Sequence, residues 1–149
     1  KIRDSVIQTL EVGSLFEEGI VIGFQNDKTQ AILISKDEFS ISKRELLDTM
    51  AVLKADGIDW HQWQIPTYGN VNFVAKLIKT NKKFKKIFME TKVVSNEPNS
   101  DNFYWSNTML SQLFGFGTFN ILNSNDRSLD GVSYKLKGLL RYIKIVDLQ

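Results

Sequence analysis

The feature that most constrains the fold is the order in which β-prone and helical patterns follow one another. Residues 19–24 and 30–35 are short β-branched runs, and the turn-forming residues 26–28 between them predict a β-hairpin. Two helical patterns occupy the middle of the chain, and the residues after 103 are β-prone again. Strands, then two helices, then strands favour an α+β fold with an antiparallel sheet over alternating βαβ units.

The two helices are predicted from their capping residues and apolar spacing. Ser42 and Glu45 form a capping box, in which the Ser42 side chain caps the helix and Glu45 reaches back. The helical spacing extends over residues 43–55, and Gly57 is typical of the residue that follows a helix. Thr67 is a candidate N-cap for a second helix, whose apolar positions are Val71, Val74, Leu77 and Ile78.

The remainder of the chain is predicted to be β-structure. Residues 103–109 are aromatic and β-prone, and residues 114–119 mix phenylalanine with glycine. The sequence Asn-Ser-Asn-Asp at 123–126 predicts a turn, and residues 132–137 and 139–146 predict two further strands.

Composition limits the classes of protein to which the chain can belong. With 149 residues, of which 42% are apolar, we expect a single domain over residues 1–149. The net charge of +2, from 19 basic and 17 acidic residues, favours neither a strong nucleic-acid binder nor an acidic tail. Absence of cysteine excludes disulfides, thiolate zinc sites and cysteine nucleophiles. No apolar run is long enough to span a membrane. The chain starts at Lys1 rather than Met, which is compatible with removal of a leader or anchor.

Four short motifs resemble one protein family. Trp63-Gln-Ile-Pro-Thr67 resembles the W-R-L-P-T signature of the Lcl C-terminal domain family, and Tyr104-Trp-Ser-Asn-Thr108 resembles its Y-W-S-S-T. Glu18-Gly-Ile-Val21, with the following Phe24, resembles the opening strand of that family, and Arg141-Tyr-Ile-Lys144 resembles its closing strand. The four motifs span about residues 12 to 146 in the same order. Gln64 and Asn107 depart from the pattern, so the resemblance is to a divergent member.

The resemblance implies a C-type lectin-like fold related to the formylglycine-generating enzyme domain. That fold has two helices, a twisted antiparallel sheet and a loop-rich region, with ligands bound by loops on one face. The expected function is a non-catalytic ligand-binding or adhesion module of a bacterial surface or secreted protein, with a glycan or protein ligand. Two alternatives remain: an assembly subunit of a larger extracellular complex, and an enzyme on the same scaffold. The formylglycine-generating activity implied by the relatives needs copper-binding cysteines, which this chain lacks.

Glu97-Pro98-Asn99 has the tripeptide with which many C-type lectins bind calcium and a hexose. Asp101, Asn102 and Asn107 offer further oxygen ligands. In calcium-dependent lectins a second set of ligands, a W-N-D sequence on a strand, lies well downstream. Here Trp105-Ser106-Asn107 follows within a few residues and lacks the aspartate. The preferred interpretation is a surface loop with a β-turn, without a metal or cofactor. Calcium held by Glu97, Asn99 and Asn107 is the alternative.

Other candidate sites are a lysine run and a single histidine. Six lysines fall within residues 76–86, which we interpret as a solvated helix face and its C-terminal turn, with binding of an anionic partner as the alternative. His61 lies between Trp60 and Trp63 and near Asp56 and Asp59, but one histidine without cysteine makes no typical zinc site. No catalytic residue is predicted. The predicted ligand-binding residues are Trp60, His61, Glu97, Asn99, Asp101, Asn102, Asn125 and Asp126.

Overall fold

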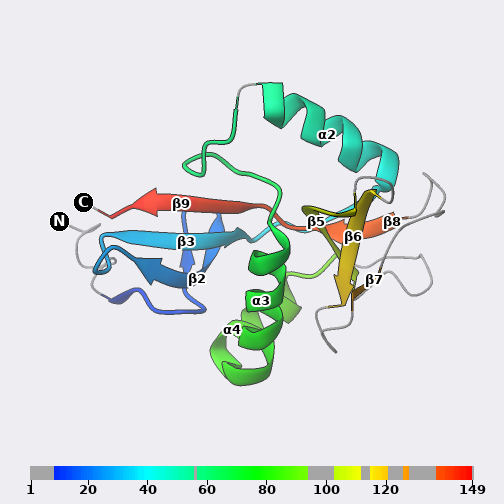
Figure 1. Ribbon diagram of the computed structural model, residues 1–149. Coiled ribbons are helices and arrows are strands. Elements are labelled where there is room, and N and C mark those ends of the chain that lie inside the picture. Colours follow the sequence, from blue (N-terminus) through cyan, green and yellow to red (C-terminus); the bar gives the residue numbers. More distant parts are fainter. Residues whose placement is uncertain are drawn as a thin grey trace.

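The computed structural model describes residues 9–55, 57–93, 103–111, 115–120, 126–127 and 137–148, and it confirms the α+β class (Figure 1). Three helices lie among the described residues, where two were predicted: α2 (Lys43–Ala55), α3 (Tyr68–Thr80) and α4 (Lys82–Glu90). The strands are β1 (Leu15–Phe16), β2 (Gly19–Gln25), β3 (Gln30–Ser35), β4 (Phe39–Ser42), β5 (Phe103–Ser111), β6 (Gly115–Asn120), β7 (Asp126–Arg127), β8 (Lys137–Leu140) and β9 (Ile143–Asp147).

The first sheet has the strand order β1-β2-β3-β9, and all its neighbours are antiparallel. The predicted hairpin is confirmed as β2 and β3, which pair from Gly19 with Ser35 to Gln25 with Gln30. The turn residues Asn26, Asp27 and Lys28 have φ values of 53°, 54° and 63°. Asn and Asp tolerate this left-handed conformation better than most residues, which explains the turn.

The second sheet has the strand order β4-β8-β5-β6-β7. Its neighbours are antiparallel except β5 and β8, which pair in parallel at Tyr104 and Leu139. Thus the strands form two sheets, where a single antiparallel sheet was expected. The predicted strand over 132–137 lies outside the described residues up to 136, and Lys137 begins β8.

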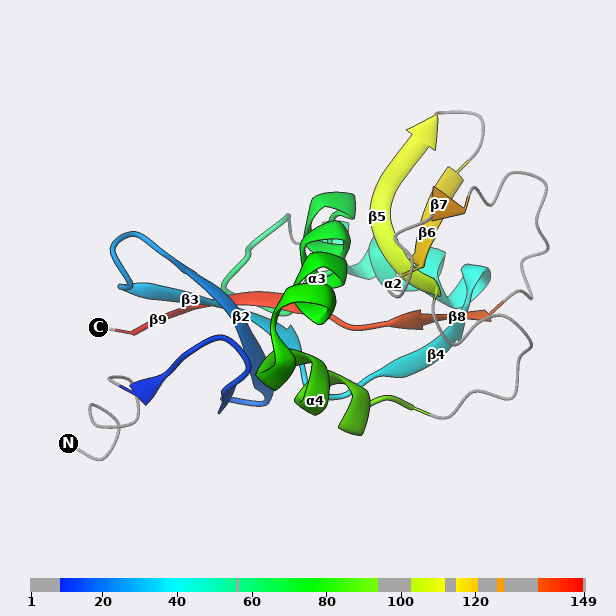
Figure 2. The same ribbon diagram turned by 90° about the horizontal axis from the view of Figure 1, so that it is seen from below.

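Two extended segments cross from one sheet to the other. The chain leaves β3 in the first sheet and enters β4 in the second after residues 36–38, and it returns from β8 to β9 through Arg141 and Tyr142 (Figure 2). The prediction of one strand over 139–146 was therefore wrong. The strand divides because β8 pairs with β4 and β9 pairs with β3, so each half belongs to a different sheet.

Helix boundaries follow from capping. The Ser42 hydroxyl accepts from the Glu45 backbone N–H at 3.2 Å, and Glu45 accepts from the Ser42 N–H at 3.0 Å, which confirms the capping box of α2. Thr67 caps α3 as predicted, with Asn70 as its reciprocal partner. Asn81 ends α3 and begins α4, because its side chain accepts from the Phe84 N–H at 2.9 Å. The lysine run is therefore divided between two helices, and the prediction of one helix with a C-terminal turn was wrong.

Three apolar clusters form the core of the described residues. Helices α3 and α4 pack on one face of the first sheet, where Val74, Ile78, Phe84 and Phe88 meet Ile20, Ile22 and Ile34. The opposite face of that sheet holds Val21, Leu33 and Val146, with Trp63 packed against them. Helix α2 covers the second sheet through Leu46 and Met50, which pack in one cluster with Ile65, Trp105 and Leu140. The two crossing segments join these clusters.

Candidate ligand-binding groove

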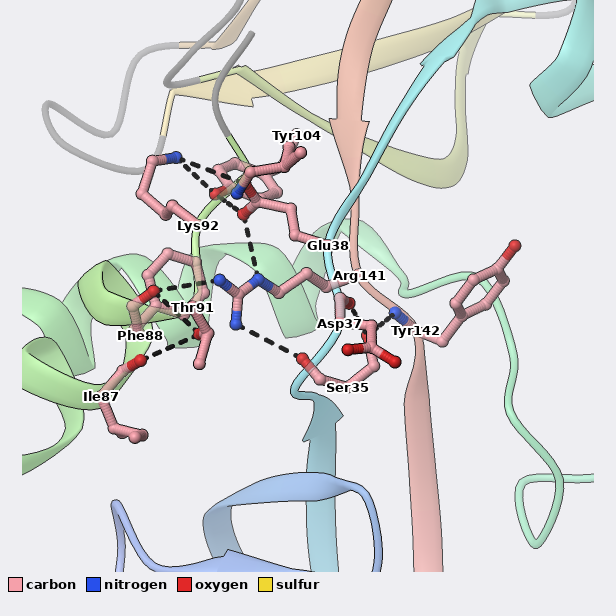
Figure 3. A network of polar contacts seen from close by, with 11 residues as sticks. Ser35, Asp37, Glu38, Ile87, Phe88, Thr91, Lys92, Tyr104, Arg141 and Tyr142 are labelled. Atoms are coloured by element: carbon pink, nitrogen blue, oxygen red, sulfur yellow. Dashed lines mark hydrogen bonds and ion pairs between the residues drawn. The ribbon is translucent and has the colours of Figure 1, made fainter.

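A buried ion pair lies where the two crossing segments run side by side. Glu38 precedes β4, and Arg141 separates β8 from β9. The Arg141 Nε donates to the Glu38 Oε1 at 3.0 Å, and the exposed fractions of the two side chains are 1% and 0% (Figure 3). Charges that are removed from water so completely require good geometry and further hydrogen bonds to be tolerated.

Those further hydrogen bonds are present on both sides of the pair. Besides Arg141, Glu38 accepts from the Val93 backbone N–H at 2.8 Å and from the Tyr104 hydroxyl. Arg141 donates to the backbone oxygens of Ser35 at 3.3 Å and Phe88 at 3.0 Å, and its guanidinium carbon lies 4.0 Å from the centre of the Phe88 ring. Across the described part of the chain, no buried side-chain nitrogen or oxygen lacks a partner. We therefore interpret the network as a rigid support.

The Tyr104 phenol is a neutral member of this network. Burial raises the pKa of Tyr104 well above its ordinary value, and the negative charge of Glu38 raises it further. The neutral hydroxyl donates to Glu38 and accepts from the Lys92 Nζ at 2.7 Å. A raised pKa makes this tyrosine a poor acid at physiological pH, so its role is to hold Glu38 in position.

Residues on either side of the buried pair point outward. Asp37 and Phe39 flank Glu38 and are exposed, whereas Glu38 is buried. This alternation is the usual period of an extended chain. Ser35 joins the two crossing segments, because its hydroxyl donates to the Asp37 carbonyl at 2.8 Å and accepts from the Tyr142 N–H at 2.9 Å. The outward-facing residues 37, 39 and 142 are therefore held at fixed positions.

These outward residues line a groove of about 260 Å³. Its lining consists of Glu18, Ser35, Asp37, Phe39, Trp63 and Tyr142, and we call it the aromatic groove. The rings of Phe39 and Tyr142 meet edge to face, with centroids 5.8 Å apart and planes at 70°. Burial raises the pKa of Tyr142, so its hydroxyl is neutral at physiological pH.

Charged groups of both signs lie at the aromatic groove. Glu18 pairs with Lys36 at 3.6 Å, and the Lys144 Nζ lies 5.6 Å from the centre of the Trp63 ring. Asp37 adds a second carboxylate. Aromatic faces beside hydrogen-bond donors and acceptors can bind a small ligand group that has both apolar and polar edges.

Most of the predicted ligand-binding residues cannot be compared with this groove. Glu97, Asn99, Asp101, Asn102 and Asn125 lie outside the described residues, as does the proposed β-turn at Pro98. Asp126 begins β7. Of the three residues in the calcium alternative, the structure describes Asn107. Its backbone N–H donates to the Pro66 carbonyl at 2.8 Å.

His61 lies on the surface between two carboxylates. Its Nε2 is 3.4 Å from Asp147 Oδ1 and its Nδ1 is 3.5 Å from Asp59 Oδ1, and all three side chains are more than half exposed. A hydrogen bond from Gln30, and then one from His61, lowers the pKa of Asp147. Among the described residues, no group of three or more His, Asp or Glu side chains could hold a metal ion.

Trp60 does not line the aromatic groove but a separate cavity. Trp60 and Asn107 line the same small cavity of about 30 Å³ below α2, together with Met50, Leu53, Ile58, Gln64 and Ile65. Trp60, a predicted ligand-binding residue, and Trp63 are both partly buried. Trp105 is fully buried, and its Nε1 donates to the Ile41 carbonyl at 3.1 Å.

Sequence reasoning missed the aromatic groove, although two signals were present. The segment 35–40 reads Ser-Lys-Asp-Glu-Phe-Ser, in which two adjacent acidic residues follow just after an apolar strand. Arg141 is a charged residue between apolar residues of a predicted strand, which indicates that it is either paired in the core or exposed at the surface. Neither signal identifies the partner of Arg141, because Glu38 is 103 residues away.

Comparison with known proteins does not identify the chain. A scan of family models finds no match, and a search of curated proteins finds no significant one. In the part of the chain that the structure describes, no helix is long and apolar enough to cross a membrane.

Proposed function

We propose that this chain is a non-catalytic ligand-binding module and that its ligand occupies the aromatic groove. The observation that carries the proposal is that the buried Glu38–Arg141 pair fixes the outward-facing Asp37, Phe39 and Tyr142. A binding site whose lining is already held in place loses little conformational freedom when a ligand enters. Rigid support directly behind aromatic side chains therefore favours recognition.

The hydrogen bonds of the Ser35 hydroxyl in the groove support binding rather than nucleophilic catalysis. A serine nucleophile needs a base that takes its proton. The Ser35 hydroxyl instead donates to the Asp37 carbonyl and accepts from the Tyr142 N–H, so its hydrogen bonds serve the backbone. In this proposal Phe39 and Trp63 contact apolar faces of the ligand, and Asp37 accepts hydrogen bonds from it. The ligand is a glycan or a segment of a protein.

Phe39 allows a matched test of the site. Its side chain is 44% exposed, and that of Phe73 on α3, away from the groove lining, is 46% exposed. The ligand is first sought by screening the whole chain against glycan and peptide arrays, with calcium and with EDTA. Phe39→Ala then removes one aromatic face and is expected to weaken binding about tenfold, from the loss of roughly 1–2 kcal/mol of apolar contact. Phe73→Ala is the control and is expected to bind as the wild type does.

The outcome of this comparison decides the site. Calorimetric titration of both variants with the best ligand measures the two dissociation constants. Equal affinity of Phe39→Ala and Phe73→Ala would exclude the aromatic groove as the binding site. Loss of binding in both variants, together with an unchanged thermal unfolding midpoint, would assign the ligand to a surface that includes α3.

We further propose that the fold is C-type lectin-like, that the chain is a divergent relative of the Lcl C-terminal domain family, and that it acts at a bacterial surface or after secretion. The order of elements supports the fold, as does a sheet that contains both β2 and the closing strand β9. Gln64 of the Trp63–Thr67 motif forms a bridge with Ile143, which lies within the Arg141–Lys144 motif. An experimental structure compared with lectin-like domains tests the fold, and fractionation of expressing cells tests the location.

Calcium is not required in this proposal. The test is thermal unfolding of the chain with calcium and with EDTA. We expect the same midpoint in both conditions. A higher midpoint with calcium would instead favour the site at Glu97, Asn99 and Asn107, because a ligand that binds only the folded state stabilises it.

A further inference from the structure

The charge of this chain is strongly segregated. Residues 68–92, which comprise α3, α4 and their immediate surroundings, contain seven lysines and one glutamate, so their net charge is +6. The whole chain has a net charge of +2, so the remaining residues together carry −4. A nearly neutral protein therefore has one strongly basic helical layer, which its overall composition conceals. Such a layer produces a local positive potential that attracts anionic partners.

The two helices present six of these seven lysines on the outside. Helices α3 and α4 lie together on one side of the β2–β3–β9 sheet (Figures 1 and 2). Val74, Ile78, Phe84 and Phe88 of these helices are buried against that sheet. The exposed positions include Lys76, Lys79, Lys82, Lys83, Lys85 and Lys86. The apolar side of each helix is already used by the core, so the basic side faces solvent.

Few of these lysines are neutralised by acidic neighbours. Lys83 pairs with Glu11, and Lys92 lies 3.8 Å from the buried Glu38. Within the described residues, no ion pair involves Lys76, Lys82, Lys85 or Lys86. The positive charge of the layer is therefore available to a partner in solution.

Apolar surface accompanies the basic layer. A groove of about 460 Å³ between β1 and α4 is lined by Gly13, Ser14, Leu15, Lys83, Lys86, Ile87 and Glu90. Leu15 is 51% exposed there, whereas Leu33, Leu46, Leu139, Leu140 and Leu148 are buried. A partner that fits both features must have negative charge next to apolar material. An anionic lipid surface has both, whereas a nucleic acid backbone or an anionic polysaccharide offers the charge without an apolar layer.

The type of cation agrees with a lipid surface. All seven basic residues of the layer are lysines. Arginine is the usual choice where phosphate is recognised by paired hydrogen bonds, whereas lysine acts as a point charge. Clusters of four to eight basic residues on an amphipathic helix are typical of proteins that bind anionic lipids. We propose that the α3–α4 layer is a docking surface for an anionic lipid bilayer, on which the protein lies peripherally. This site is separate from the aromatic groove, because Trp63 packs on the opposite face of the first sheet.

Sedimentation with vesicles tests the proposal directly. The whole chain is mixed with phosphatidylcholine vesicles or with vesicles that also contain phosphatidylglycerol. We expect it to bind only the anionic vesicles, and raising the ionic strength is expected to release it. Lys82→Glu/Lys85→Glu is expected to weaken binding at least about 25-fold, because each lysine near an anionic membrane contributes about fivefold to the binding constant.

A matched variant separates the docking surface from overall net charge. Lys28→Glu/Lys43→Glu changes the net charge equally but lies outside the α3–α4 layer, in the β2–β3 turn and at the start of α2. It is expected to bind anionic vesicles much more strongly than Lys82→Glu/Lys85→Glu does. Far-ultraviolet circular dichroism reports whether charge reversal impairs folding. If it does, Lys82→Gln/Lys85→Gln replaces Lys82→Glu/Lys85→Glu as the test variant. Equal losses in the two glutamate variants would overturn the proposal, and so would an unchanged affinity of Lys82→Glu/Lys85→Glu.

Leu15 distinguishes a lipid surface from other anionic partners. Leu15→Ser is expected to weaken vesicle binding about fivefold, since half of its side chain is available for contact with lipid. The same variant is expected to elute from a heparin column at the wild-type salt concentration. Retention on heparin or on RNA without binding to anionic vesicles would overturn the lipid proposal and assign the layer to a soluble polyanion.

Discussion

Replacement of Glu38 by glutamine is the most direct test of the buried network. The substitution keeps the shape of the side chain but removes its charge. Arg141, of which 1% is exposed, then loses its only acidic partner among the described residues. Breaking a buried ion pair from one side costs about 3–5 kcal/mol, because the remaining charge is buried without compensation. This is a large part of the total stability of a typical domain, which is about 5–15 kcal/mol.

Urea denaturation, followed by tryptophan fluorescence, measures this loss. With a slope of about 2 kcal/mol per molar urea, a loss of about 4 kcal/mol lowers the unfolding midpoint by about 2 M. The matched control is Glu11→Gln. Glu11 also pairs with a lysine, Lys83, but its side chain is 65% exposed. Exposed pairs contribute about 0–1 kcal/mol, so the control is expected to unfold close to the wild type.

A double-mutant cycle isolates the interaction between the two charges. Arg141→Met removes the positive charge and leaves the Ser35 and Phe88 carbonyls without this donor. Alone, it is expected to cost about 3–5 kcal/mol. The double variant Glu38→Gln/Arg141→Met removes both charges of the buried pair. Its loss of unfolding free energy is therefore expected to be smaller, by about 2–3 kcal/mol, than the sum of the losses in the two single variants.

Two results would refute this reasoning. A cost of Glu38→Gln no larger than that of Glu11→Gln would mean that the buried pair does not hold the sheets together. Strict additivity in the cycle would mean that the two side chains stabilise the protein independently. In that case the support of the aromatic groove would have to come from the backbone pairing of β3 with β9 and β4 with β8.

Three further predictions concern single residues. Tyr104→Phe removes the phenol that donates to Glu38 and is expected to cost about 1.5–3 kcal/mol at pH 7. Because the pKa of Tyr104 is raised in the folded state, its contribution is fully present below about pH 10 and lost as the pH rises further, at about 1.4 kcal/mol per unit. Denaturation from pH 8 to 11 should therefore show the variant and the wild type converging. In Gly138→Ala the new Cβ would lie 2.7 Å from Trp105 Nε1, and overpacking is expected to cost about 1–3 kcal/mol in thermal unfolding. Asn81→Ala removes the cap of α4 and is expected to cost about 1 kcal/mol in the same assay. Unchanged stability in any of these variants would contradict the corresponding contact.

The elements that sequence predicted well are set by local chemistry. The Ser42 and Thr67 caps, and the 26–28 turn, each depend on side chains within a few residues of one another. The same local reasoning failed at Asn81, which ends one helix and caps the next. Asn is a preferred N-cap residue, so Asn81 carried a sign of the second helix that the prediction did not use.

The division of the last strand could not be predicted from local sequence. Residues 139–146 have a continuous β-prone pattern, and the break at Arg141 depends on pairing with β3 and β4 from the other end of the chain. The aromatic groove has the same origin, since Phe39 and Tyr142 meet only after both crossing segments are in place. The predicted ligand-binding residues Glu97, Asn99, Asp101, Asn102 and Asn125 lie outside the described residues.

The alternation along residues 37–39 has a consequence for how binding specificity could change. Asp37 and Phe39 contact solvent, and Glu38 between them faces the interior. Substitutions at 37 and 39 can thus give the groove new chemistry while the interior charge pair stays intact. Insertion or deletion of one residue in this segment would exchange the outward-facing and inward-facing side chains, because one step along an extended chain turns every side chain to the other face. Positions 37 and 39 are therefore expected to tolerate changes of residue type, whereas the segment is not expected to tolerate changes of length, which a library of variants with selection for folding can measure.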